Sequence, residues 1–211
     1  MDGYIFDMDG TLLDSMHVWD EVPQQYMIRK GLQPVENMLE MFAHMSLTQT
    51  ALYLQEHFGI NDDVDTIISD VNACVAYQYE EVVSLKEGIY DCIWNLKKRG
   101  KTLCLLTACD VDLARAALKR CGILDAFTKI MTCETLGYSK TETILYDNVV
   151  SHMGWSKENC VFIEDSLHAI EAIKKAGYKV YAVYDKANEK DWTMICKCSD
   201  AAFQHIKEME I

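Results

Sequence analysis

Residues 3–15 read GYIFDMDGTLLDS, a short apolar run followed by two acids, a glycine and a polar turn. The run from Gly3 to Phe6 predicts a buried strand. Asp7 and Asp9 follow it two residues apart, so both side chains can face the same side of the chain. Gly10 allows a sharp turn just beyond them. An isolated Asp-x-Asp pair usually marks a solvated turn, so its meaning depends on what the rest of the chain places beside it.

From Gly88 onward, short apolar runs alternate with amphipathic segments of helical period. The predicted strands are Thr102–Leu106, Lys129–Thr132, Cys160–Ile163 and Lys179–Val183. The predicted helices are Gly88–Arg99, Asp110–Cys121, Thr141–Met153 and Ser166–Ala176. Strands that alternate with helices form β-α-β units and a parallel sheet. We therefore predict an α/β fold with a Rossmann-like parallel sheet flanked by helices. The tail from Ala187 predicts a polar helix and a short final element without an assigned place.

The first strand is separated from its sheet by a segment in which nothing alternates like a strand. Ser46 and Gln49 form a capping-box pattern for a helix that ends at Phe58. A further helix is predicted from Asn61 to Tyr79, capped by Asn61 or Asp62. We therefore expect a catalytic core of residues 1–14 and 86–211, with an α-helical cap of residues 15–85 inserted after the first strand.

The formal charge is −13 and is unevenly distributed. No Lys or Arg occurs between Gly31 and Leu85, whereas nine acids do. These acids are Glu36, Glu40, Glu56, Asp62, Asp63, Asp65, Asp70, Glu80 and Glu81. Such a surface repels phosphate backbones and anionic lipid, so we expect neither nucleic acid nor a membrane as a partner.

Other features of the composition point to a cytoplasmic protein. The N-terminus carries acids where a signal peptide would carry a basic segment. No apolar run approaches the roughly 20 residues that cross a bilayer. The nine cysteines include no Cys-x-x-Cys pair, which indicates reduced thiols rather than a disulfide framework. The sequence leaves the oligomeric state open.

Acids also follow a second predicted strand, because Glu164 and Asp165 come directly after Ile163. Thr107 follows another strand, and Lys140 precedes the helix that leads to the Glu164 strand. In open parallel sheets, ligands bind beyond the carboxyl ends of the strands, where these side chains converge with Asp7 and Asp9. Four carboxylates in one small cleft need a counter-ion. Mg²⁺ suits them, because it prefers oxygen ligands and completes its shell with water and substrate phosphate.

Four segments in order resemble the motifs of one family. FDMDGTLLDS, residues 6–15, closely resembles the first motif of haloacid dehalogenase-type phosphatases. LLTACD at 105–110 looks like the second motif, Lys140 like the third, and IEDS at 163–166 like the fourth. The position of the cap is similar to that in the helical-cap subfamily, which contains the β-phosphoglucomutase-like proteins. Here Lys140 is followed by Thr141 rather than the usual Pro, which leaves the start of that helix open.

The resemblance implies a reaction through an aspartyl-phosphate. Asp7 would be the nucleophile that attacks phosphorus. Asp9 would protonate the leaving oxygen and then activate the hydrolytic water. The metal ligands would be Asp7, Glu164, Asp165 and the backbone carbonyl of Asp9.

The resemblance also implies that Thr107 and Lys140 hold the phosphoryl oxygens. Amides near Ala108 would add donors at the start of a helix. The expected activity is Mg²⁺-dependent hydrolysis of a phosphomonoester, with a small phosphorylated metabolite as substrate.

Two alternatives stay open. A sugar phosphomutase of the β-phosphoglucomutase type would place a His early in the first cap helix and an Arg in the cap. Here Trp19 takes the early position, His17 is two residues off register, and no Arg lies between Gly31 and Leu85. A non-catalytic phospho-acceptor module would carry its acceptor Asp after a central strand, not the first. A phosphatase is favoured over both.

Two further expectations concern the cap and a thiol. Without Lys or Arg from Gly31 to Leu85, a cap presenting Trp19, Tyr26, Met45 and Gln49 suits a monophosphate with an uncharged leaving group, such as a sugar or nucleoside monophosphate. Arg29, Lys30 and Lys86 would lie at the borders of the cap. Cys109 lies at a helix start two residues after Thr107, where a lowered thiol pKa would make the enzyme sensitive to oxidation, but a passive buried thiol is the favoured interpretation.

Overall fold

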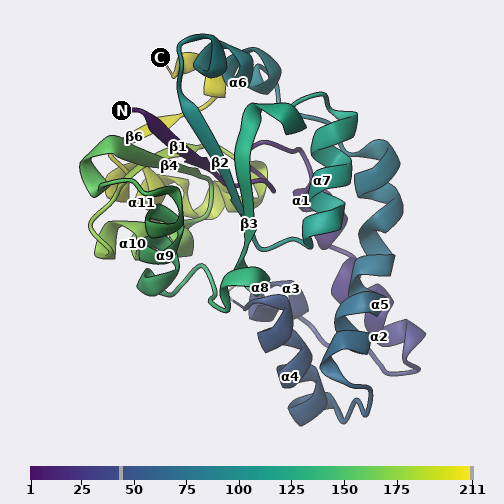
Figure 1. Ribbon diagram of the computed structural model, residues 1–211. Coiled ribbons are helices and arrows are strands. Elements are labelled where there is room, and N and C mark those ends of the chain that lie inside the picture. Colours follow the sequence, from purple (N-terminus) through teal and green to yellow (C-terminus); the bar gives the residue numbers. More distant parts are fainter. Residues whose placement is uncertain (43–44, 210–211) are drawn as a thin grey trace.

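The computed structural model describes residues 1–42 and 45–209, and six parallel strands form its sheet. The strands are β1 (Gly3–Phe6), β2 (Thr102–Thr107), β3 (Phe127–Thr132), β4 (Cys160–Glu164), β5 (Lys179–Val183) and β6 (Ala201–Phe203). Their order is β3-β2-β1-β4-β5-β6 (Figure 1), so the first strand lies between β2 and β4. The carboxyl ends of β1, β2 and β4 therefore meet at one edge. This confirms the predicted α/β parallel sheet.

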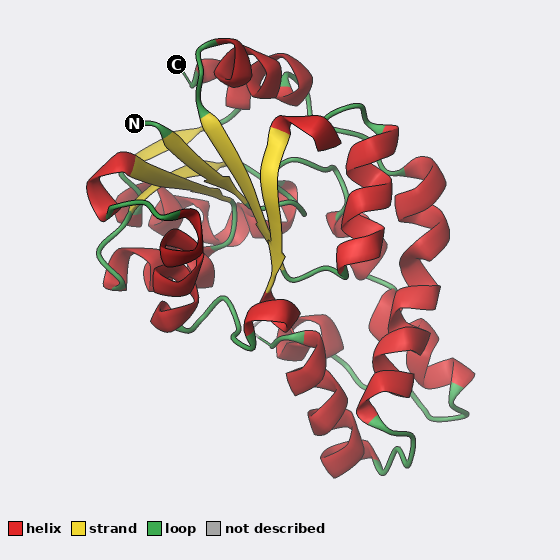
Figure 2. Ribbon diagram, viewed as in Figure 1, coloured by secondary structure: helices red, strands yellow, loops and turns green. Residues whose placement is uncertain are grey.

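Helices cover both faces of the sheet (Figure 2). In the core they are α6 (Ile89–Lys98), α7 (Val111–Arg120), α8 (Cys133–Leu136), α9 (Thr143–Met153), α10 (Leu167–Lys175) and α11 (Trp192–Cys198). Apolar side chains of α6 and α7 pack on one face of β1, β2 and β4. Those of α9, α10 and α11 pack on the other face. The alternation along each strand feeds both cores, since Phe6 joins the first and Ile5 the second.

A block of helices follows β1 and projects away from the sheet (Figure 1). It contains α1 (Met16–Trp19), α2 (Val22–Arg29), α3 (Met38–Phe42), α4 (Leu47–Phe58), α5 (Val64–Tyr77) and a π-helical turn at Gln78–Val82. The two segments that connect this block to the core lie side by side. Leu13 forms an antiparallel β-bridge with Leu85, and the amide of Asp14 donates to the carbonyl of Ser84. This pairing supports the division that we propose, with a cap of residues 15–85.

The capping box that starts α4 is confirmed. The Ser46 hydroxyl accepts from the Gln49 amide at 3.2 Å, and the Gln49 side chain accepts from the Ser46 amide at 2.8 Å. The predicted cap of the next helix was wrong, because Asp63, rather than Asn61 or Asp62, accepts from the Thr66 amide.

Two details at the other end of the chain were also not as predicted. Helix α9 begins at Thr143 and not Thr141, because the Glu142 carboxylate folds back to the Ser139 amide and holds the preceding turn open. The unassigned tail contributes α11 and the edge strand β6, which pairs with β5. Strand β6 has only three residues, all half-buried, which is too short a pattern to predict.

Candidate active site

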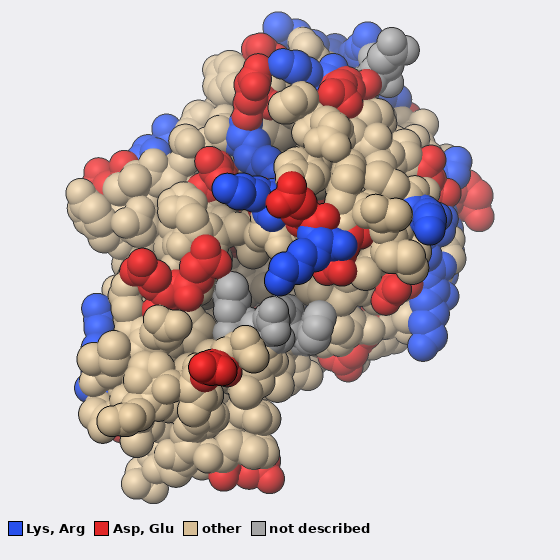
Figure 3. Space-filling model, turned by 180° about the vertical axis from the view of Figure 1, so that it is seen from behind, with Lys and Arg blue, Asp and Glu red and all other residues tan. Residues whose placement is uncertain are grey.

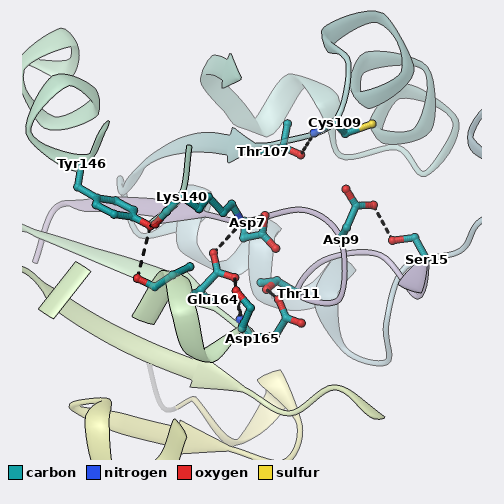
Figure 4. Close-up of polar contacts among 12 residues, drawn as sticks. Asp7, Asp9, Thr11, Ser15, Thr107, Cys109, Lys140, Tyr146, Glu164 and Asp165 are labelled. Carbon is teal, nitrogen blue, oxygen red and sulfur yellow. Dashed lines mark hydrogen bonds and ion pairs between the residues drawn. The ribbon is translucent and has the colours of Figure 1, made fainter. Parts of the chain in front are cut away.

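Three carboxylates and one lysine meet at the carboxyl ends of β1 and β4 (Figure 4). Oxygens of Asp7, Glu164 and Asp165 lie within 4.8 Å of one another. The Lys140 ammonium lies between two of them and donates to Asp7 and, at 2.8 Å, to Glu164. All three acids are buried. The register explains the meeting, since Phe6 of β1 stands beside Ile163 of β4, so Asp7 and Glu164 leave the sheet together.

The close spacing of these acids shifts their pKa values. Burial, followed by the charge of Glu164, raises the pKa of Asp7 to about 7 against the opposing pull of Lys140. Burial and the charges of Glu164 and Asp7 also raise the pKa of Asp165 well above its usual value. Although burial opposes it, Lys140 keeps the pKa of Glu164 below its ordinary value. Without a further cation, the cluster therefore retains protons near neutral pH.

The donor set fits a hard divalent cation. Three carboxylate oxygens on one side of a cavity suit Mg²⁺, which takes oxygen ligands and keeps several waters. A dication would also remove the repulsion that raises the pKa values of Asp7 and Asp165. The chain thus has the ligands for such an ion and an electrostatic reason to bind one.

Asp165 is held from two directions. Its Oδ1 accepts from the Thr11 hydroxyl at 3.1 Å, and its Oδ2 accepts from the Asn188 amide at 2.7 Å. Gly10 makes this approach possible, because a Cβ at position 10 would stand 2.3 Å from Asp165 Oδ2 and the backbone there has φ of +81°. The turn after β1 therefore needs glycine for close approach to the acid.

Asp9 is oriented differently from the other acids (Figure 4). It accepts from the Ser15 hydroxyl at 2.6 Å and from the Tyr79 hydroxyl, and Tyr79 in turn accepts from Trp19 Nε1 at 2.7 Å. Burial raises the pKa of Asp9, and the bonds from Ser15 and Tyr79 partly offset this. Asp9 is thus a partly buried carboxyl fixed by the cap, separate from the cluster of Asp7, Glu164 and Asp165.

The remaining predicted site residues lie at the end of β2. Ala108 lines the cavity and is exposed, whereas Thr107 is fully buried behind it. The Thr107 hydroxyl accepts from the Cys109 amide at 3.0 Å and retains its own proton for donation. Cys109 is a buried thiol, as the favoured interpretation has it, and the hypothesis of a lowered pKa was wrong. Burial, followed by the charges of Asp9 and Asp110, raises the pKa of its thiol well above the ordinary value.

A cavity of about 810 Å³ lies between this edge and the cap. Asp7, Asp9, Lys140, Glu164 and Asp165 form part of its wall. Neutral cap residues form the opposite wall, among them Trp19, Met38, Phe42 and Leu54. The space is large enough to bury a substrate of drug-like size.

The cations expected at the borders of the cap do not line this cavity. Arg29 and Lys30 lie at the end of α2 and are therefore part of the cap rather than of its border. The Lys30 ammonium forms ion pairs with carboxylate oxygens of Asp62 and Asp70, each at 2.6 Å. Lys86 donates to Asp185 at 2.8 Å and to the carbonyl of Tyr184 at 2.7 Å. It thereby fixes the segment that carries Asn188. Within residues 1–42 and 45–209, the Lys and Arg side chains of the cavity wall are Lys140 and Lys190, and His168 also lines it.

Sequence reasoning missed several residues that support the site. Ser15, Thr11, Tyr79 and Asn188 all bond to its carboxylates, yet only Ser15 and Thr11 lie in the quoted first motif. Tyr79 and Asn188 come from distant segments, and no local pattern around them indicates a contact with an acid. The structure places Tyr79 in a π-helical turn, a feature that is frequent at functional sites but that the sequence does not predict.

Comparison with known proteins agrees with this geometry. The family model described as haloacid dehalogenase-like hydrolase matches residues 4–183. Hexitol phosphatase B of Escherichia coli (strain K12) is 25% identical over 175 residues, covering 82% of this chain and 78% of that protein.

Two solved structures share the fold. CbbY from Rhodobacter sphaeroides in complex with phosphate aligns with a TM-score of 0.84 at 18% identity, covering 100% of this chain and 96% of that one. A putative β-phosphoglucomutase from Thermotoga maritima aligns with a TM-score of 0.69 at 22% identity, covering 96% and 94%. The chain therefore belongs to the haloacid dehalogenase-like hydrolases and is an enzyme of the phosphatase type.

Proposed function

We propose that this protein is a Mg²⁺-dependent phosphomonoesterase that acts through an aspartyl-phosphate on Asp7. The observation that carries the proposal is the placement of Asp7 in the cavity wall, beside Lys140 and the two acids after β4. A carboxylate nucleophile, a fixed cation and a metal-binding set thus share one wall. The name of hexitol phosphatase B shows that this family includes phosphatases of small phosphorylated alcohols.

In the first step, an Asp7 oxygen attacks phosphorus and the bond between phosphorus and the ester oxygen breaks. Asp9 gives its proton to the leaving oxygen, so that a neutral alcohol departs. Burial favours this role, because it raises the pKa of Asp9 and keeps a proton available. The Lys140 ammonium, held between Asp7 and Glu164, stabilises negative charge on the transferring oxygens.

In the second step, Asp9 takes a proton from water while the water oxygen attacks phosphorus. The bond between phosphorus and Asp7 breaks, and inorganic phosphate leaves with Asp7 restored. Asp7, Glu164, Asp165 and the Asp9 carbonyl would hold Mg²⁺, which supplies charge neutralisation for the dianionic phosphate. Thr107 and the amides near Ala108 would donate to the phosphoryl oxygens.

The mutase is a weaker reading of the same fold. A mutase must hold a second phosphate against the cap, and the described cap side chains of the cavity wall carry no charge. His17 is exposed and is not among the described residues of that wall, whereas Trp19 is. Lys190 of the core is the cation that could compensate, and it is exposed. These observations favour hydrolysis of monophosphates.

Phosphate release from a panel of phosphomonoesters, with Mg²⁺ or with a chelator, tests the proposal. We expect release that depends on Mg²⁺, and kcat/KM for monophosphates above that for matched bisphosphates. Acid quenching during turnover should trap a phosphorylated chain that the Asp7→Asn variant does not form. Interconversion of sugar phosphates without net phosphate release would instead support the mutase.

A further inference from the structure

Among the described residues, the wall that the cap contributes to the cavity has few hydrogen-bonding side chains. Its described residues are neutral, and most are aliphatic or aromatic, such as Met16, Val22, Met38, Phe42 and Leu54. This is the wall that faces the acids, so it must contact the part of the substrate that leaves. On the outside, the lower lobe in Figure 3 is formed mainly by residues other than Lys, Arg, Asp and Glu, with some acids among them.

Few polar atoms of the cap remain available in that wall. The indole N–H of Trp19 is already donated to Tyr79 at 2.7 Å. The Tyr26 hydroxyl is inaccessible to solvent, so it is not presented to the cavity, whereas Thr50 is a half-buried residue of the wall. Among the described cap residues of the wall, Thr50 is therefore the side chain that can still bond to a leaving group that must give up its water.

The polar side chains of the core do not compensate for this. Lys140 and the acids are committed to the phosphate end of the cavity. Ser166 and His168 belong to the same end, because Ser166 donates to Glu164 at 2.9 Å and His168 lies close enough to Glu164 to interact with its charge. Asn188 bonds to Asp165. Glu171, Lys190 and Asp191 are exposed and therefore stay hydrated. A polyol leaving group would find partners for only a minority of its hydroxyls.

The cost of that mismatch is large enough to set specificity. A buried hydroxyl without a partner weakens binding on the order of tenfold, because its desolvation is not repaid. A methylene buried in the same place strengthens binding about fourfold. The cap wall therefore discriminates strongly by the number of hydroxyls on the leaving group.

We infer that the substrate is the phosphate monoester of an alcohol with a largely hydrocarbon or aromatic body, and not of a polyol. This rests on the proposed phosphatase activity and narrows its substrate class. Thr50 fits a body that carries one polar atom. In this the chain differs from what the name of its relative hexitol phosphatase B states of that protein.

The test compares hexyl phosphate with a hexitol phosphate, which share the phosphate and the length of the carbon chain but differ in hydroxyls. We expect kcat/KM for hexyl phosphate to be at least tenfold higher. Equal or faster turnover of the hexitol ester would overturn the inference while leaving the phosphatase in place.

Two variants make the comparison specific to the cap wall. Met45→Gln places an amide at a half-buried wall position. It should lower the ratio of kcat/KM for hexyl phosphate to kcat/KM for the hexitol phosphate about tenfold. Thr50→Val removes a hydroxyl from the wall and should raise that preference. Met194→Gln is the matched control, since Met194 is exposed on α11 and is not among the described residues of the wall. An unchanged ratio in Met45→Gln and Thr50→Val, with melting temperatures preserved, would show that the wall does not select the substrate.

Binding separates this inference from the proposed function. Calorimetry with hexylphosphonate and the corresponding hexitol phosphonate, neither of which needs turnover, should show tighter binding of the alkyl compound. If no ester releases phosphate yet hexylphosphonate binds more tightly, the proposed function fails, whereas the preference of the cavity for a hydrocarbon body over a polyol stands. Tighter binding of the hexitol phosphonate would overturn the inference whether or not the enzyme turns over.

Discussion

The two walls of the cavity are built on opposite principles. The core wall gathers Asp7, Glu164, Asp165 and Lys140 on short segments that leave a parallel sheet in fixed register. The cap residues of the wall that the structure describes are neutral, and they come from helices that lie away from the sheet (Figure 1). Charge on one wall and its absence on the other assign different tasks to them. The core wall suits the phosphoryl group, and we propose that the cap wall selects what is attached to it.

Removal of the proposed nucleophile should produce the largest effect on the core side of this comparison. Asp7→Asn keeps the volume but loses the attacking oxygen, so kcat should fall by roughly 10⁴-fold or more. Burial raises the pKa of Asp7, so a neutral Asn should not lower the melting temperature of the metal-free protein at pH 8. Steady-state phosphate release and thermal melting measure both. Asp14→Asn, at an exposed acid of the same segment, is the control, and substantial Mg²⁺-dependent activity in Asp7→Asn would refute the assignment.

Asp9→Asn should have a smaller effect that depends on the leaving group. With an alkyl phosphate, loss of the general acid and base should lower kcat about 10²- to 10⁴-fold. With p-nitrophenyl phosphate the first step should change little, because its leaving group needs little protonation. Rapid-quench measurement of the phosphorylation step tests this, and equal losses on both esters would rule out the acid role.

The two walls also differ in how far the sequence predicts them. Strands β1 to β5, the acids at their ends and Lys140 were all identified, because a strand has a short local signature and parallel strands share one end. The capping box of Ser46 was local too, and it was correct. Tyr79 was missed because its partner Asp9 lies 70 residues away and their meeting depends on how the whole cap rotates against the core. The position of Asn188 likewise depends on Lys86, because Lys86 is 99 residues from Asp185 in the sequence and donates to it.

Magnesium should stabilise the core wall in a pH-dependent way. In the metal-free protein, folded Asp7 has a pKa of about 7, above its ordinary 3.8, so between those values the folded chain holds more protons than the unfolded chain. The free energy of unfolding contributed by Asp7 therefore falls as pH rises through this range. Mg²⁺ must displace these protons, so its stabilisation should be larger at pH 8 than at pH 5.

Thermal melting with Mg²⁺ and with a chelator at the two pH values measures this effect. Asp165→Asn should reduce the shift caused by Mg²⁺, whereas Asp147→Asn, at an acid paired with Lys157 elsewhere on the surface, should not. A shift of equal size at pH 5 and pH 8 would contradict the linkage to Asp7.

The hydrogen bond from Tyr79 joins the two walls, and its loss should have a moderate effect. Tyr79→Phe removes a donor to Asp9, so kcat should fall about tenfold. Since this bond lowers the pKa of Asp9 against burial, the variant should have a higher Asp9 pKa. Asp9 would then stay protonated for the first step up to a higher pH, and it would become deprotonated for the second step only at a higher pH. The pH–rate profile should therefore move to higher pH. Tyr178→Phe removes a similar bond to Asp147 and should leave the profile unchanged. An unmoved profile in Tyr79→Phe would mean that Tyr79 does not position Asp9.

The smallest effect is expected at Cys109, which lies where the two walls meet and contributes to the cavity lining. Its thiol is only 2% exposed, and burial raises its pKa well above the ordinary value, so very little thiolate is present at neutral pH. Peroxide reacts with thiolate, and therefore mild peroxide should inhibit the wild type and Cys109→Ser to the same small extent. Cys196 is exposed and provides the comparison, because mass spectrometry after brief treatment should find oxidation there before it appears at Cys109. Faster inactivation of the wild type than of Cys109→Ser would show that the cap opens far enough to expose this thiol. The two walls would then separate during turnover more widely than their bonded arrangement here indicates.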